Sequence, residues 1–147
     1  MPTSFNEVPP QDEPPEPPRV ETGGIGGERF LIVEDEPLVA LLLADALEEA
    51  GGTIVGTAAP VEEALRYIES EKIDAGLLDC NLNGRAIDEV ASALSCRGVP
   101  FLFVSGYGQA GKPRDFADAP VLGKPFTHVQ LMRATEALVR QGIRSPV

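Results

Sequence analysis

Five polar side chains follow short apolar runs, where strands of a sheet could end. Glu34 and Asp35 come directly after the run FLIV, Asp79 after GLL, Ser105 after FLFV, and Lys124 after VLG. On its own, each residue has an ordinary explanation as a helix cap, a turn or a solvated loop. If the strands are neighbours, however, three carboxylates, a hydroxyl and an ammonium group meet in one cleft.

Such a cleft has the chemistry of a phosphate site. Three clustered carboxylates repel one another unless a cation neutralises them. Mg2+ suits them, because it binds oxygen and typically uses one or two carboxylates together with phosphate oxygens. Phosphoryl transfer needs charge neutralisation and in-line positioning more than acid-base machinery. A carboxylate can itself be the nucleophile, which yields an acyl phosphate.

The elements that must position these residues alternate between strand and helix. Pro37 and Pro60 suit helix starts, Gly51 and Gly52 stop the first helix, and Thr127 with Gln130 forms a capping box. This alternation predicts an α/β fold, a doubly wound parallel sheet with its site at the carboxyl ends of the strands. We expect five strands and four main helices. The strands are expected at 30–33, 53–57, 75–79, 100–104 and 121–122, and the helices at 37–50, from 60, around 87–94 and from 127.

One helical unit is weak. Between Ser105 and Val121 the sequence reads GYGQAGKPRDFADAP, with three glycines and two prolines. A regular helix here would lack both propensity and an apolar face. We therefore expect a short, frayed or absent fourth helix.

The sequence predicts one domain, at 28–141, between two tails. Residues 1–27 hold seven prolines within the first 18 positions and then a glycine-rich stretch, which predicts a disordered tail. The prolines could bind a partner as a polyproline ligand, although a passive tail is the simpler interpretation. Residues 142–147 are expected to form a short C-terminal tail.

Composition limits the classes of function. The chain is 43% hydrophobic but only 5% aromatic, so its core must be aliphatic. A net charge of -11 disfavours nucleic acid as a partner. We find neither a secretory signal nor an apolar run long enough for a bilayer, and we expect a cytoplasmic protein. Cys80 and Cys96 lack metal-ligand spacing and are expected to be reduced thiols.

The segment from Leu38 to Ala44 is apolar around the whole helix. A surface helix needs only one apolar stripe, so some of these side chains should be exposed beside the cleft. Two interpretations stay open: a docking face for a helix bundle or a second copy, and simple deep burial.

Four motifs resemble those of the response-regulator receiver domain of two-component signalling: LIVEDEP, LLDCNLNG, FLFVSGYG and GKPF. The resemblance covers residues 29–141 and implies strand order 2-1-3-4-5. It implies that Asp79 accepts a phosphoryl group from a histidine kinase or phosphotransfer protein. It also implies that Lys124 pairs with the phosphoryl oxygens and that the Ser105 hydroxyl moves onto them. The implied Mg2+ ligands are Glu34, Asp35, Asp79 and the backbone carbonyl of Asn81.

Two positions depart from the usual receiver pattern. Val121 stands where most receivers have an aromatic switch residue, and Tyr107 follows Ser-Gly directly. FVSGYG is similar to the stand-alone subgroup known for a Phe-Ala-Thr-Gly-Gly-Tyr-like motif (FATGUY), which is associated with a reduced fourth helix. We therefore expect signalling through ordering of residues 106–119. Pairing Asp35 with Glu36 is the alternative alignment of the acidic pair.

We interpret the chain as a single-domain response regulator that signals through a protein partner or acts as a phosphate sink. It is expected to be a monomer or weak dimer and not an enzyme beyond its own phosphorylation and dephosphorylation. One alternative is a phosphatase of the haloacid dehalogenase type, which is disfavoured because Asn81 stands where a second Asp is needed. An unphosphorylated interaction module is the other alternative.

Overall fold

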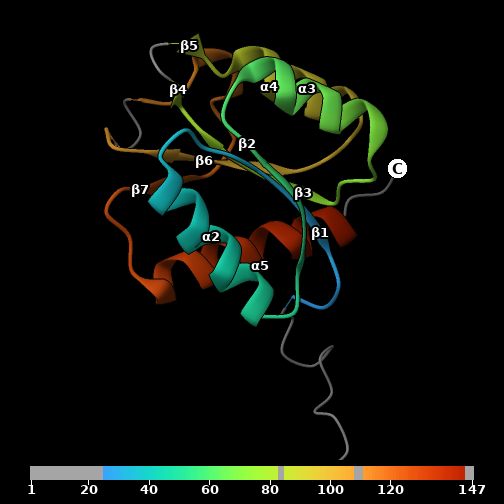
Figure 1. The fold of residues 1–147 in the computed structure, drawn as a ribbon, viewed down its shortest axis with the longest axis vertical. Helices are drawn as coiled ribbons and strands as arrows, with labels where there is room; N and C mark the ends of the chain where they lie inside the picture. Colours follow the sequence, from blue (N-terminus) through green and yellow to red (C-terminus); the bar gives the residue numbers. More distant parts are fainter. Residues whose placement is uncertain (1–24, 83–84, 108–110, 145–147) are drawn as a thin grey trace, which may run out of the picture.

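A five-stranded parallel sheet forms the centre of the molecule in the computed structural model (Figure 1). The structure describes residues 25–82, 85–107 and 111–144, and residues 1–24 of the expected tail lie outside that part. The strand order is β2-β1-β3-β6-β7, which is the predicted order 2-1-3-4-5. The strands are β1 (Arg29–Val33), β2 (Thr53–Ala58), β3 (Ala75–Asp79), β6 (Phe101–Ser105) and β7 (Val121–Gly123).

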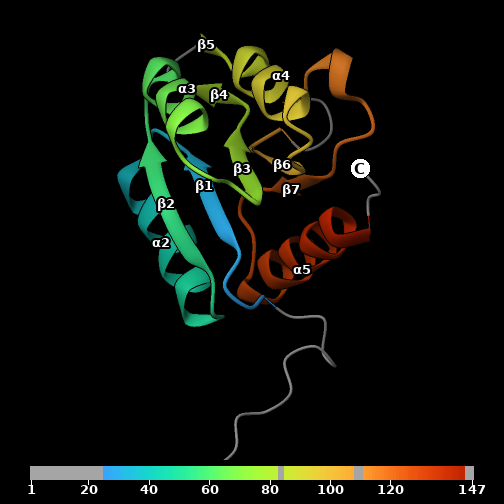
Figure 2. The ribbon, with the colours of Figure 1, turned by 90° about the vertical axis from the view of Figure 1, so that its right-hand side faces the viewer.

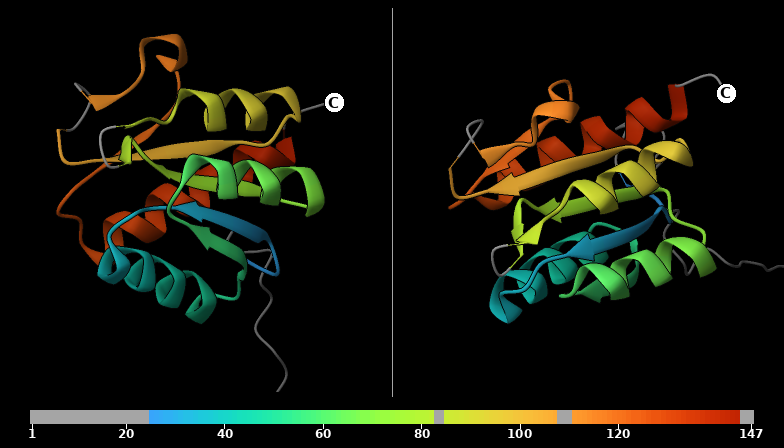
Figure 3. Two further views of the ribbon diagram at one scale, coloured as in Figure 1. Left: turned by 45° about the horizontal axis from the view of Figure 1, so that its top comes forward. Right: turned by 90° about the horizontal axis from the view of Figure 1, so that it is seen from above.

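Four α-helices cover the two faces of this sheet. In Figure 2 and Figure 3, α2 and α5 lie on one face, while α3 and α4 lie on the other. Successive strand residues alternate between the two cores, so that Phe30 and Ile32 face α2 and α5 while Leu31 and Val33 face α3 and α4. The helices are α2 (Pro37–Glu49), α3 (Val61–Ser70), α4 (Asp88–Cys96) and α5 (His128–Arg144).

Local signals explain where these helices begin and end. Pro37 opens α2, and Gly51 follows its end at φ 107, a conformation that glycine adopts without strain. The expected capping box of α5 is present. The Gln130 N–H donates to Thr127 Oγ1 at 3.0 Å, and the Thr127 N–H donates to Gln130 Oε1 at 2.9 Å.

The predicted weakness of the fourth helix is confirmed in the described residues between β6 and β7. They include the 3-10 turn Arg114–Phe116 (η3) and no α-helix. Lys112 holds the segment together, because its Nζ donates to the carbonyl oxygens of Ala117 at 2.6 Å and Ala119 at 2.9 Å. Phe116 packs edge-on against Phe101, with ring centroids 5.7 Å apart, and so covers a part of the sheet where a regular helix would lie.

Some details differ from expectation. The ordered fold includes Ile25, which is 5% exposed in the core beside α2 and α5, and the Gly27 N–H donates to Gly51 O at 2.9 Å. At the other end α5 continues to Arg144. After β3, two short antiparallel strands, β4 (Asn81–Leu82) and β5 (Arg85–Ala86), form a pair that the sequence did not predict. None of the helices in the described ranges is both long and apolar enough to cross a bilayer.

Candidate functional site

Three carboxylates converge at the carboxyl ends of β1 and β3. Glu34 and Asp35 leave β1 directly, and the Glu34 N–H still donates to Ala58 O of β2 at 2.9 Å. Asp79 ends β3, the central strand, in which every residue is buried. Glu34 is 3% and Asp79 6% exposed, while Asp35 is half-buried. Each side chain offers one carboxylate oxygen to a set that lies within 4.8 Å, as the sequence predicts.

Lys124 brings a cation to the same place. Its backbone N–H donates to Ser105 O at 2.8 Å, which continues the β6–β7 pairing beyond Gly123. Its Nζ lies 3.2 Å from Glu34 Oε1, 3.3 Å from Glu36 Oε1 and 3.8 Å from Asp79 Oδ1. The ammonium group is therefore held among the carboxylates.

The electrostatics keep this ammonium charged. Burial alone would lower the pKa of Lys124, but a hydrogen bond to Glu34 and the charges of Asp79 and Glu34 outweigh it. The net pKa is raised above its ordinary value, so Lys124 carries a full positive charge at neutral pH.

The acidic residues fit a hard divalent cation. Glu34 Oε1 is buried and has no hydrogen-bond partner among the described residues, although it forms an ion pair with Lys124 Nζ at 3.2 Å. That oxygen therefore has lone pairs available beside the oxygens of Asp35 and Asp79. An all-oxygen donor set with a buried carboxylate that lacks hydrogen bonds suits Mg2+. Asn81 lies in β4 two residues beyond Asp79, and its carbonyl as a ligand stays a prediction.

Ser105 ends β6 and is 2% exposed. Its Oγ accepts a hydrogen bond from the Tyr107 N–H at 3.0 Å. A Cβ built on Gly111 would overlap Ser105 Oγ, so any other residue at this position would require the hydroxyl or the loop to move. Sequence reasoning missed Gly111, because its proximity to Ser105 depends on how the loop folds back.

The two departures from the receiver pattern occupy different environments. Tyr107 is 77% exposed, whereas Val121 in β7 is half-buried against the core beside α3 and α4. No aromatic side chain therefore occupies position 121 at the β7 edge, in agreement with the sequence.

Cys80 adjoins Asp79 and is half-buried. Burial and the negative charge of Asp79 raise its pKa to about 11, against weaker opposing contributions from a Ser105 hydrogen bond and Lys124. This thiol is thus protonated at neutral pH and suits no nucleophilic role.

The acidic pair is Glu34 with Asp35 by geometry. Glu36 stays outside the three-carboxylate cluster, and its side chain, 63% exposed, reaches Lys124 from the solvent side. The alternative alignment, which pairs Asp35 with Glu36, receives no support. No local pattern predicts the contact of Glu36 with Lys124, because the two residues lie 88 positions apart.

Comparison with protein families settles the class. The model of the response regulator receiver domain matches residues 30–136. The chain belongs to the response regulator receiver domain family. Its fold, strand order and motif positions are those expected of a receiver, and receivers are signalling modules rather than conventional enzymes.

Several relatives of this receiver are known. Transcriptional regulatory protein PdtaR of Mycobacterium tuberculosis is 34% identical over 115 residues, which is 76% of this chain and 56% of PdtaR. TcrA of the same species is 35% identical over 125 residues, or 82% of this chain and 49% of TcrA. The chain thus spans about half the length of these curated relatives.

The solved structure of SdrG from Sphingomonas melonis Fr1 is matched over nearly its whole length. It is 44% identical with a TM-score of 0.69, and the match covers 77% of this chain and 97% of SdrG. The structure of the BeF3-activated conformation of SdrG is 45% identical with a TM-score of 0.66, covering 76% and 95%. PhyR from Brucella abortus is 27% identical with a TM-score of 0.73, covering 86% of this chain and 53% of that one.

Proposed function

We propose that this receiver accepts a phosphoryl group on Asp79 from a histidine kinase or a phosphotransfer protein, in a reaction that depends on Mg2+. The observation that carries the proposal is the position of Lys124 Nζ, 3.2 Å from Glu34 and 3.8 Å from Asp79, beside a three-carboxylate cluster. A site built only for stability would not need a second and third acid around one buried ion pair.

In the proposed step an Asp79 carboxylate oxygen attacks the phosphorus of a phosphohistidine. The new P–O bond forms as the P–N bond breaks, and the electron pair of that bond returns to the imidazole nitrogen. Asp79 carries the acyl phosphate afterwards. Lys124 neutralises charge on the phosphoryl oxygens from the side of β7, because its ammonium group stays protonated.

Glu34, Asp35, Asp79 and the Asn81 carbonyl would hold the Mg2+. Bound there, the ion neutralises the negative charge that builds up on the phosphoryl oxygens during transfer. The buried Glu34 Oε1, which accepts no hydrogen bond, and the 4.8 Å cluster support this assignment.

Ser105 is the proposed link to the output. Its hydroxyl now accepts the Tyr107 N–H, and a phosphoryl group on Asp79 would compete for it. Movement of Ser105 would disturb Gly111, which packs against the same oxygen. We therefore infer that phosphorylation changes the order of residues 106–119, as expected for the FATGUY subgroup, with Tyr107 and Val121 tuning the response.

The exposed face of α2 is the proposed docking surface for the phosphodonor. Leu38, Leu41 and Leu42 are 80%, 56% and 54% exposed, on the helix that begins beside Glu34 and Asp35. Exposed leucines in one patch are typical of a protein contact. Leu38→Ser with Leu42→Ser should slow phosphotransfer without unfolding the domain, and unchanged transfer would refute this assignment. The same face could support a weak dimer.

Downstream, a protein partner or competition for kinase phosphate would supply the output, and we propose a cytoplasmic location without contact to nucleic acid or membrane. The net charge of -11 supports the absence of nucleic-acid binding.

The test is a titration with Mg2+ and then beryllofluoride, followed by amide NMR. We expect Mg2+ to shift amides near Glu34, Asp35 and Asp79, and beryllofluoride to shift those of Ser105 and 106–119. Asp79→Asn is the matched control and should lose the beryllofluoride response. An unchanged wild-type spectrum would instead favour an inert interaction module, and turnover of phosphomonoesters would favour the phosphatase alternative.

A further inference from the structure

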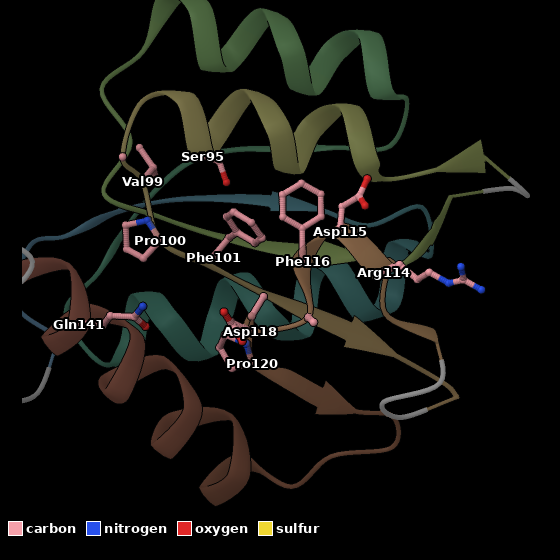
Figure 4. Close-up of a pocket in the computed structure, with 13 residues that line it drawn as sticks. Ser95, Val99, Pro100, Phe101, Arg114, Asp115, Phe116, Asp118, Pro120 and Gln141 are labelled. Atoms are coloured by element: carbon pink, nitrogen blue, oxygen red, sulfur yellow. The ribbon is translucent and has the colours of Figure 1, made fainter.

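A groove with an aromatic floor lies on the opposite end of the sheet from the acidic cluster. It encloses about 500 Å3 between α4, the 3-10 turn η3 and α5. Figure 4 shows the rings of Phe101 and Phe116 in its centre, with Pro100 and Val99 at one side and Pro120 below. The groove lies where, among the described residues, the 3-10 turn η3 takes the place of an α-helix that would cover this part of β6.

The groove continues toward the point where the chain enters the domain. A second hollow of about 420 Å3 shares Gly98, Val99 and Pro100 with the first. Gly26 and Gly27 form part of its wall. Because Ile25 is anchored in the core, the 24 residues that precede it are attached next to the second hollow, which adjoins the first.

Those 24 residues include a segment with the composition of a polyproline ligand. The stretch DEPPEPP, residues 12–18, has four prolines, and six residues separate it from Ile25. Six extended residues span up to about 20 Å. Segments of this kind bind grooves lined by aromatic side chains, and they lose little conformational entropy on binding.

The rim of the groove offers hydrogen-bond donors for such a segment. A polyproline helix leaves its carbonyl groups without internal partners, so it needs donors from the surface on which it lies. Gln141 projects from α5 toward the hollow in Figure 4, and Arg97 lines the adjoining hollow at the end of α4. Both side chains are exposed.

Charge alone does not favour this contact. Asp115 and Asp118 line the groove and Asp74 the adjoining hollow, while the proline segment is itself acidic. Binding must therefore rest on contacts of the prolines with the half-buried ring of Phe116, on donors such as Arg97, and on the high effective concentration of a tethered ligand.

We propose that the proline segment 12–18 docks in this groove of its own chain, against the half-buried ring of Phe116. The docked segment would cover the part of the sheet that the reduced fourth helix leaves open. The proposal does not depend on phosphorylation of Asp79.

A spin label on Cys96 tests the contact. Cys96 is exposed at the end of α4, next to groove residue Ser95, and in a Cys80→Ala background it is the single thiol. In the full-length protein the amides of Gln11, Glu13 and Glu16 should lose most of their NMR intensity in the oxidised label and recover on reduction. Replacing the four prolines of the segment by serine keeps its charge and should abolish the loss.

Two further samples make the result decisive. Gln141→Ala with Arg97→Ala removes exposed donors without touching the core, and it should weaken the broadening. A mixture of isotope-labelled protein with spin-labelled, isotope-free protein should show no broadening. Tail amides that keep full intensity in the spin-labelled full chain, or that broaden to a similar extent in the mixture, would overturn docking within one chain.

Discussion

Removing the charge of Lys124 should lower the free energy of unfolding, because the acidic cluster then lacks its ammonium group. In Lys124→Met the Glu34 carboxylate, whose side chain is 1% exposed, loses the ammonium group at 3.2 Å. Breaking a buried ion pair on one side costs 3–5 kcal/mol, and the Lys124 side chain is 21% exposed, so we expect about 3 kcal/mol. For a domain of this size that loss lowers the urea midpoint by about 2 M.

The assay is urea unfolding in the presence of a chelator, so that no divalent cation replaces the lost charge. Lys72→Met is the matched control, because Lys72 is 78% exposed and lies 3.9 Å from Asp74. It should change the free energy of unfolding by less than about 0.5 kcal/mol.

A double-mutant cycle with Glu34→Gln isolates the pair. Once the carboxylate of Glu34 is neutral, Lys124→Met should lower the free energy of unfolding much less than it does in the wild type. The difference is a coupling energy of about 1–3 kcal/mol. If the two single effects add to within about 0.5 kcal/mol, the ion pair is not the cause of the destabilisation and the reasoning is refuted.

Four other predictions concern parts of the fold outside the ion pair. With a chelator present near pH 9, an alkylating reagent should modify Cys96 well before Cys80, as peptide masses will show. In the folded protein the pKa of Cys80 is raised from 9.0 to about 11, so between these pH values the folded thiol keeps a proton that the unfolded chain loses. The free energy of unfolding should therefore fall as pH rises from about 9 to about 11. Thr127→Ala removes the cap of α5 and should cost about 1 kcal/mol in urea unfolding, whereas Thr127→Ser should keep most of it. Leu43 is 1% exposed, and Leu43→Ala should lower the free energy of unfolding by about 2–5 kcal/mol. Leu42 is 54% exposed, and Leu42→Ala should lower it far less. Equal losses would contradict the assignment of Leu43 to the buried face of α2 and of Leu42 to the exposed face.

Much of the fold follows from local sequence signals. Short apolar runs bounded by glycine or proline predict the five strands, since a parallel sheet buries both faces of a strand such as β3. The weak fourth helix also follows from composition, because glycine and proline lower helix propensity regardless of tertiary context. The strand order came from the resemblance of the motifs to receivers, because local patterns do not specify which strands are neighbours.

What the sequence could not predict depends on contacts between distant segments. Glu36 reaches Lys124 only because β1 and β7 end at the same edge of the sheet. The close approach of Gly111 to Ser105 arises from the return of the loop. Burial of Ile25 depends on the shape of the core beside α2 and α5, and composition alone placed it in a tail.

The shortness of β7 has a consequence for solubility. It is an edge strand of the sheet, and the described residues that precede it form no α-helix that could cover it. Exposed edge strands recruit strands from other molecules, which leads to aggregation. Here the strand has three residues and lies between Pro120 and Pro125, neither of which has a backbone N–H to donate. A receiver with a reduced fourth helix is in this way protected from edge-to-edge association by its own prolines.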